Sequence, residues 1–159
     1  MTHDYKRHGT TTLFAALNVL QGTIIAHCMP RHRNQEFLLF LRRLDREFPA
    51  HLDSHLILDD YGTHKHLHVT QWLAKGPGFH LHFIPTSFCW LNLIERWFAK
   101  LAGKQIRHGI FHSVPELIQA IKNHIKVNNN DPVPFVWTAS AQSIMAKINR
   151  CKAIDATPR

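Results

Sequence analysis

A run of apolar residues that leads straight into a carboxylate constrains the fold of this chain more than any other feature. Residues 56–58 read Leu-Ile-Leu, Asp59 follows, and the segment breaks at Gly62. A short apolar run bounded in this way is typical of a buried β-strand, with Asp59 at its carboxyl end. Because open α/β sheets bind their ligands at the carboxyl ends of strands, Asp59 is a candidate ligand-binding residue. The alternative interpretation is an ordinary turn residue.

A second acid, Glu95, lies within a helical pattern. Apolar residues recur there at spacings of three, four and three: Leu91, Ile94, Phe98 and Leu101. An acid at a strand end and an acid on a helix can converge on one divalent cation. Mg²⁺ is commonly held by one or two protein carboxylates, with water and phosphate oxygens completing the octahedron. The alternative is that Glu95 simply faces water, as most helical glutamates do.

The residues around the two acids form extended motifs. Residues 58–66 read L-D-D-Y-G-T-H-K-H, and residues 85–98 read P-T-S-F-C-W-L-N-L-I-E-R-W-F. This pair resembles the second and third acidic motifs of the D-D-E transposases, in the bacterial insertion-sequence branch of the Tc/mariner superfamily. Residues 60–94, thirty-five in all, separate Asp59 from Glu95, and this gap is similar to the usual gap in that superfamily. The resemblance extends from about His3 to Arg150.

The resemblance implies a chemistry and a set of site residues. Asp59 and Glu95 correspond to catalytic acids that bind Mg²⁺ or Mn²⁺, and Asp60, where the family often has Asn, is a further candidate metal ligand. His64 occupies a position where the family motif also carries His, and we group it with Lys65 as candidate DNA contacts. The intact family hydrolyses DNA at transposon ends and then uses the freed 3′-hydroxyl to attack target DNA. The implied partners are therefore the DNA of the transposon ends and the target DNA. A second copy of the chain or an intact transposase is a further implied partner, as a dimer.

Periodicity along the chain predicts a mixed α/β domain. Strands are expected at 11–19 and 23–29, as a hairpin, and again at 56–59 and 79–83. Helices are expected from an Asn34 cap to Phe48, at 65–75, at 90–107, from the capping box Ser113–Glu116 to a break at 128–132, and from Thr138. This order resembles an RNase H-like (integrase-type) mixed sheet with flanking helices. We expect residues 1–150 to be a partial transposase catalytic domain and residues 151–159 to be a frayed tail.

The first strand of that fold, which carries the first Asp of the family triad, is expected to be missing. Residues 3–10 resemble the linker that follows it, and Asp4 has no apolar strand around it. The end-reading helix-turn-helix module is also expected to be absent. Two-metal phosphoryl transfer needs both ions in place, so we expect the chain to be inactive alone. The alternative function is a catalytically inactive remnant that binds DNA without specificity or interacts with intact transposase.

The charge of the chain favours polyanionic partners. The formal net charge is +8 and the sequence pI is about 9.8. Four basic residues recur along the Glu95 helix at spacings of four, four and three: Arg96, Lys100, Lys104 and Arg107. On one helical face they predict a stripe that contacts DNA phosphates, which positions DNA without reading its sequence. The alternative is an ordinary solvated face.

Histidines and cysteines suggest other sites less strongly. Zinc is an alternative for the histidine-rich segments (His64, His66, His68, His80 and His82), but no H-E-x-x-H motif or cysteine pair accompanies them. The three cysteines are far apart, as expected for free thiols in a reducing cytoplasm. No membrane-spanning run is present, and we expect a bacterial cytoplasmic, nucleoid-associated protein without membrane partners.

Overall fold

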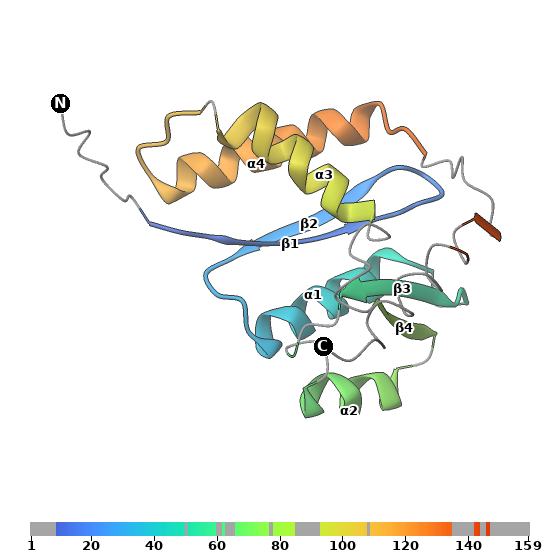
Figure 1. The fold of residues 1–159 in the computed structure, drawn as a ribbon. Helices are drawn as coiled ribbons and strands as arrows, with labels where there is room; N and C mark the ends of the chain where they lie inside the picture. Colours follow the sequence, from blue (N-terminus) through green and yellow to red (C-terminus); the bar gives the residue numbers. More distant parts are fainter. Residues whose placement is uncertain are drawn as a thin grey trace, which may run out of the picture.

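The computed structural model describes residues 9–49, 51–59, 62, 66–76, 78–84, 93–107, 109–134, 142–143 and 146. Within this part of the chain, strands and helices follow the order β1, β2, α1, β3, α2, β4, α3, η3, α4 (Figure 1). The predicted mixed α/β class is therefore confirmed. The helix expected from Thr138 falls almost entirely outside the described residues.

The predicted hairpin is confirmed. Strand β1 (Thr12–Leu17) pairs antiparallel with β2 (Ile24–Met29), and a tight turn joins them. Gly22 lies in that turn with φ of 74°, a left-handed conformation that suits glycine. Both strands are apolar at nearly every position, as expected for strands that are covered on both faces.

Helix α1 (Asn34–Glu47) begins one residue earlier than predicted. The N-cap is Arg33 rather than Asn34, and its side chain makes no capping hydrogen bond. The Arg33 guanidinium instead pairs with the carboxylate of Glu36, and this pairing lowers the pKa of Glu36. The helix ends before Pro49, as expected, because proline cannot continue the helix.

Strands β3 (Ser54–Asp59) and β4 (Phe79–Ile84) form a second, parallel pair, connected by helix α2 (Leu67–Lys75). Side chains of both strands alternate between the two faces of the sheet. Leu56 and Leu58 of β3, like Phe79 and Leu81 of β4, pack against the core on the α1 side. The intervening side chains, among them Ile57, face the opposite side and are exposed.

The Glu95 helix is shorter and less regular than predicted. Helix α3 (Leu93–Leu101) continues into one π-helical turn, η3 (Ala102–Ile106). Helix α4 (Val114–Asn130) then begins with the predicted capping box, in which the Ser113 hydroxyl accepts a hydrogen bond from the Glu116 N–H at 3.3 Å. The predicted break at residues 128–132 is wrong in part, because α4 continues through Asn130.

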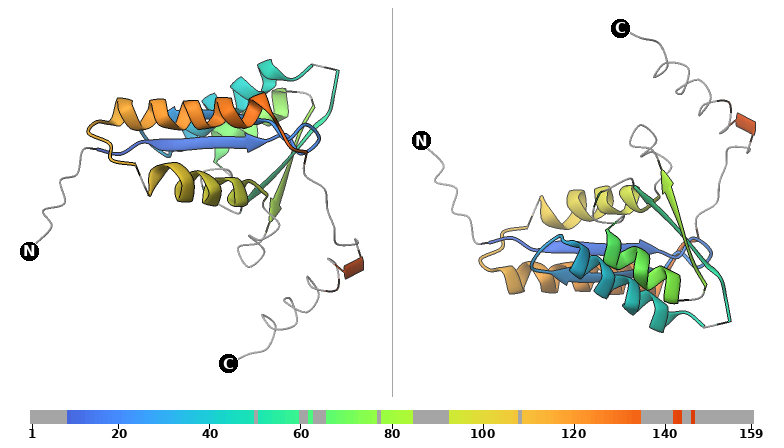
Figure 2. Two further views of the ribbon diagram at one scale, coloured as in Figure 1. Left: turned by 90° about the horizontal axis from the view of Figure 1, so that it is seen from above. Right: turned by 90° about the horizontal axis from the view of Figure 1, so that it is seen from below.

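The hairpin forms the middle of three layers. Helices α3 and α4 cover one face of β1 and β2, and α1 covers the other; β3, β4 and α2 lie on the same side of the hairpin as α1 (Figures 1 and 2). Phe14 and Met29 belong to the core with α1, whereas Ile24 belongs to the core with Trp97 of α3 and Ile121 of α4. The hairpin thus holds together two separate cores, since its alternate residues serve opposite faces.

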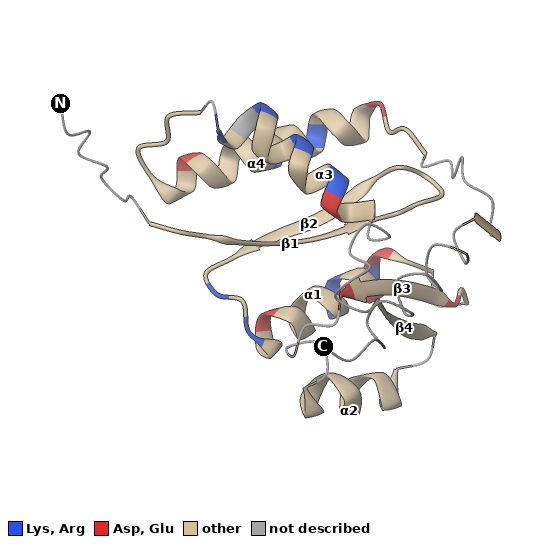
Figure 3. Ribbon diagram, viewed as in Figure 1, with Lys and Arg blue, Asp and Glu red and all other residues tan. Residues whose placement is uncertain are grey.

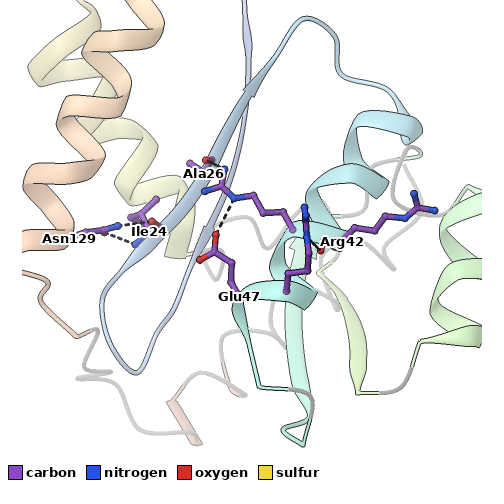
Figure 4. A network of polar contacts seen from close by, with 7 residues as sticks. Ile24, Ala26, Arg42, Glu47 and Asn129 are labelled. Atoms are coloured by element: carbon purple, nitrogen blue, oxygen red, sulfur yellow. Dashed lines mark hydrogen bonds and ion pairs between the residues drawn. The ribbon is translucent and has the colours of Figure 1, made fainter.

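Side chains occupy the outer edge of β2. Asn129 of α4 bonds both backbone groups of Ile24: its Oδ1 accepts from the N–H and its Nδ2 donates to the C=O, each at 2.8 Å. Arg43 of α1 donates to the Ala26 carbonyl at 3.0 Å and to Glu47 (Figure 4). This edge of the sheet is therefore closed by hydrogen bonds that a neighbouring strand would otherwise make.

Candidate active site

Asp59 is the last residue of β3, and its side chain is exposed. Pairing of β3 with β4 fixes its position, because Asp59 stands opposite Ile84, the last residue of β4. The Leu56 and Leu58 side chains anchor the strand in the core. Asp59 therefore projects from a fixed strand end, the position predicted from the sequence.

Glu95 lies in the first turn of α3 and is also exposed. Its helix is held by the buried Trp97 and Leu101, which turn the preceding acid away from the core. A carboxylate in a first turn interacts favourably with the partial positive charge of the helix N-terminus.

Asp59 and Glu95 open onto one pocket of about 340 Å³. Among the described residues, its walls come from consecutive positions of β1 and β3, and from α1 and the start of α3. Most of the lining is apolar, and the two acids are its carboxylates. The two acids singled out in the sequence thus line one pocket, although 35 residues separate them along the chain.

The two acids fit a single hard cation better than a closed metal cage. Within the described ranges, no group of three or more His, Cys, Asp or Glu is arranged to hold a metal ion. Two carboxylates beside an open pocket match Mg²⁺, which keeps several waters and accepts phosphate oxygens as further ligands. Asp60, the third candidate ligand, lies outside the described residues.

The four predicted basic residues are all exposed on one helical segment. Arg96 and Lys100 lie on α3, Lys104 lies in η3, and Arg107 follows it; Figure 3 shows basic residues along this segment and on α4. The wider π-helical turn breaks the 3.6-residue spacing that predicted a single stripe. His64 and Lys65, the other candidate DNA contacts, lie outside the described residues.

His55, which the sequence analysis did not single out, lies against two of the histidines that it did. His55 of β3 stacks on His80 and His82 of β4, and its Nδ1 lies 2.9 Å from Nε2 of His82. Parallel pairing places residues 55 and 80 side by side, and a pairing of the two strands was not part of the prediction. His66 instead caps α2, accepting a hydrogen bond from the His68 N–H.

Burial perturbs another histidine near the basic segment. His124 of α4 lies 6.0 Å from the Trp97 ring, measured between ring centroids. Burial lowers the pKa of His124, and the nearby Lys104 lowers it further.

Comparison with known proteins shows the family to which the chain belongs. The chain belongs to the DDE superfamily of endonucleases, whose family model matches residues 2–118. Over 90 residues, 57% of the chain, it is 26% identical to a protein of Shigella sonnei described as "Insertion element IS630 uncharacterized 39 kDa protein". The matched segment spans 26% of that relative's length. These similarities confirm the resemblance to D-D-E transposases of the insertion-sequence branch.

Within the described residues, no helix is long and apolar enough to cross a bilayer.

Proposed function

We propose that this chain carries the metal-binding acids of the catalytic domain of an insertion-sequence transposase, and that Asp59 and Glu95 hold a divalent cation. One observation supports this above all: the two acids, one at a strand end and one in a helix first turn, open onto the same pocket. Membership in the DDE superfamily supports it independently. Residues 1–150 would then form part of one catalytic domain.

The order of the elements supports an RNase H-like arrangement. An antiparallel hairpin, a helix and a parallel β-α-β unit follow one another along the chain. In such an arrangement β3 presents Asp59 at the edge where α3 begins. The acid would be held by strand pairing and Glu95 by helix packing, so neither would depend on a loop for its position.

A bound Mg²⁺ or Mn²⁺ would supply charge neutralisation at the DNA phosphate that reacts. Asp59 and Glu95 would supply two of its oxygen ligands and orient it toward the open side of the pocket. Asp60 would add a third carboxylate. Arg96 and Lys100, which are exposed beside Glu95 on α3, would hold the flanking phosphates of the DNA backbone.

Cation binding tests this proposal directly. We expect Mn²⁺ to bind the purified chain weakly in isothermal titration calorimetry and to raise its melting temperature through mass action. Asp59→Asn or Glu95→Gln should abolish both effects while preserving the fold, because both side chains are exposed. Asp45→Asn removes an exposed carboxylate on α1 and should leave them unchanged. An unaltered Mn²⁺ response in both pocket variants would refute the assignment.

A DNA-binding role without cleavage is the second candidate. The exposed basic residues of α3 and η3 and the formal charge of +8 favour it. The two candidates differ in one assay, incubation of a supercoiled plasmid carrying cognate ends with the protein and Mn²⁺. End-specific nicking that Asp59→Asn abolishes would support a competent catalytic domain. Retention on DNA without nicking would support the second candidate.

A further inference from the structure

Three histidines share the solvent-facing side of strands β3 and β4. His80 and His82 are two residues apart on β4, so they stand on the same face of the sheet. His55 of β3 lies directly opposite His80 and diagonally from His82. All three histidines are exposed, whereas Leu56 and Leu81, which alternate with them, pack against the core. The strand register therefore holds the histidines together on one fixed surface.

Two ring nitrogens of this group face each other at close range. Nδ1 of His55 lies 2.9 Å from Nε2 of His82, the distance of an N–H···N hydrogen bond. When both rings are neutral, one of the two facing nitrogens carries the proton and the other offers a lone pair. We call His55 and His82 the histidine pair. The pair presents two nitrogens, each a possible metal ligand, at one point of an exposed face.

The spacing of the two nitrogens suits a single metal ion. Zn²⁺ binds imidazole nitrogens at about 2.0–2.1 Å, which places two nitrogens of a tetrahedral site about 3.3–3.4 Å apart. The histidine pair reaches this separation when its 2.9 Å distance opens by about 0.4 Å. Exposed rings can make this shift by small rotations, while strand pairing keeps the two backbones in place.

His80 and Asp53 flank the histidine pair. The His80 ring stacks on that of His55, with centroids 4.8 Å apart and planes 20° apart. Nε2 of His80 lies 3.6 Å from Oδ1 of Asp53, close enough for an ion pair when the ring is protonated. Within the described residues, no group of three or more His, Cys, Asp or Glu is arranged to hold a metal ion. An ion at the histidine pair would therefore take its remaining ligands from water.

We propose that the histidine pair binds a divalent transition-metal cation of the zinc type, through Nδ1 of His55 and Nε2 of His82. Imidazole suits Zn²⁺, Cu²⁺ and Ni²⁺, whereas carboxylates such as those of Asp59 and Glu95 suit Mg²⁺ and Mn²⁺. The histidine pair and the two acids thus select different ions, and this inference does not rest on the proposed function.

Binding of the ion changes where one proton sits. With Zn²⁺ on both facing nitrogens, His55 carries its proton on Nε2 and His82 carries its proton on Nδ1. Since one facing nitrogen holds a proton in the metal-free protein, one of the two rings must change tautomer. That proton passes to the other nitrogen of the same ring, so none is released when both rings start neutral.

Long-range ¹H–¹⁵N spectra of the histidine rings test this inference, because they report the tautomer of each ring. The full chain is titrated with ZnCl₂ at about pH 8, where an ordinary histidine is neutral. We expect Zn²⁺ to fix the Nε2–H tautomer of His55 and the Nδ1–H tautomer of His82, with one of the two changed from its metal-free form. These spectra need no variant, so the test stands even where a substitution impairs folding.

Variants show whether the two rings share one ion. Loss of an outer-shell partner alone costs a metal site about 10–100-fold in affinity, so His55→Gln should weaken Zn²⁺ binding at His82 at least tenfold, and His82→Gln should do the same at His55. His51→Gln is the matched control, because it removes an exposed histidine in the turn before β3. Asp59→Asn should leave this Zn²⁺ response unchanged, so a failure of the proposed function would be recognised separately.

Two results would overturn the inference. One is a parent protein in which Zn²⁺ alters neither the His55 ring nor the His82 ring. The other is a His82 ring that responds to Zn²⁺ as strongly in His55→Gln as in the parent protein, which would show that the two histidines do not hold a common ion.

Discussion

Replacing Asn129 by alanine tests how the hairpin is held to α4. The Asn129 side chain makes two hydrogen bonds of 2.8 Å to Ile24, one to its N–H and one to its C=O. A hydrogen bond contributes about 1 kcal/mol net, and a buried polar group left without a partner costs about 1–3 kcal/mol. Ile24 is only 2% exposed, so water does not readily replace the amide. We expect the free energy of unfolding to fall by about 2–3 kcal/mol.

Urea denaturation followed by circular dichroism measures this loss. For a chain of this size, each 1 kcal/mol lowers the melting temperature by about 2–4 °C, so a fall of roughly 4–12 °C is expected. Asn130→Ala is the matched control, because Asn130 is the exposed next residue of the same helix. Equal stability of the two variants, within about 0.5 kcal/mol, would refute the role of Asn129.

Asn129→Asp distinguishes the two hydrogen bonds. The carboxylate keeps an acceptor for the Ile24 N–H but puts a second acceptor against the Ile24 carbonyl. We expect the Ile24 amide to remain protected from hydrogen exchange in this variant and to lose protection in Asn129→Ala. Equal exchange in both variants would show that the Ile24 amide does not depend on this acceptor.

Three further predictions concern DNA, a helix cap and pH. Replacing Lys100 and Lys104 together by alanine should weaken DNA binding about equally on any duplex. The slope of log affinity against log salt concentration should become shallower by roughly one unit per lost phosphate contact. Salt-independent binding would contradict this prediction. Ser113→Ala should lower stability by about 1 kcal/mol through loss of the cap of α4, and Ser113→Asp, which keeps an acceptor, should not. Burial lowers the pKa of His124 below its ordinary value of 6.5, so the folded state binds this proton less readily than the unfolded state. Stability should therefore fall as pH drops below about 6.5, and His124→Gln should lose less stability than the parent between pH 7.5 and 5.5; an equal loss in both would contradict the assignment.

Local patterns in the sequence were sufficient for most of the elements. The continuous apolar character of residues 12–17 and 24–29 predicted strands, because both faces of the hairpin are covered by helices. The Ser113 capping box predicted the start of α4, because its hydrogen bond joins residues three apart. Both signals are local, so neither needs knowledge of distant contacts.

Features that depend on distant contacts were not predictable in this way. A run of three asparagines ordinarily ends a helix, yet α4 continues through Asn130 because Asn128 and Asn129 bond to the hairpin more than a hundred residues away. Tertiary hydrogen bonds there outweigh a low helix propensity. The His55–His82 contact likewise arises from strand pairing between residues 27 apart.

The same distinction between local patterns and distant contacts applies to the candidate site. Family motifs indicated Asp59 and Glu95, but no pattern in the sequence showed that the edges of β1 and β3 would face each other across the pocket between them. That arrangement follows from the sheet order, in which neither edge has a strand neighbour among the described residues. Sequence motifs thus indicate chemistry, whereas open edges emerge only when strands are placed in space.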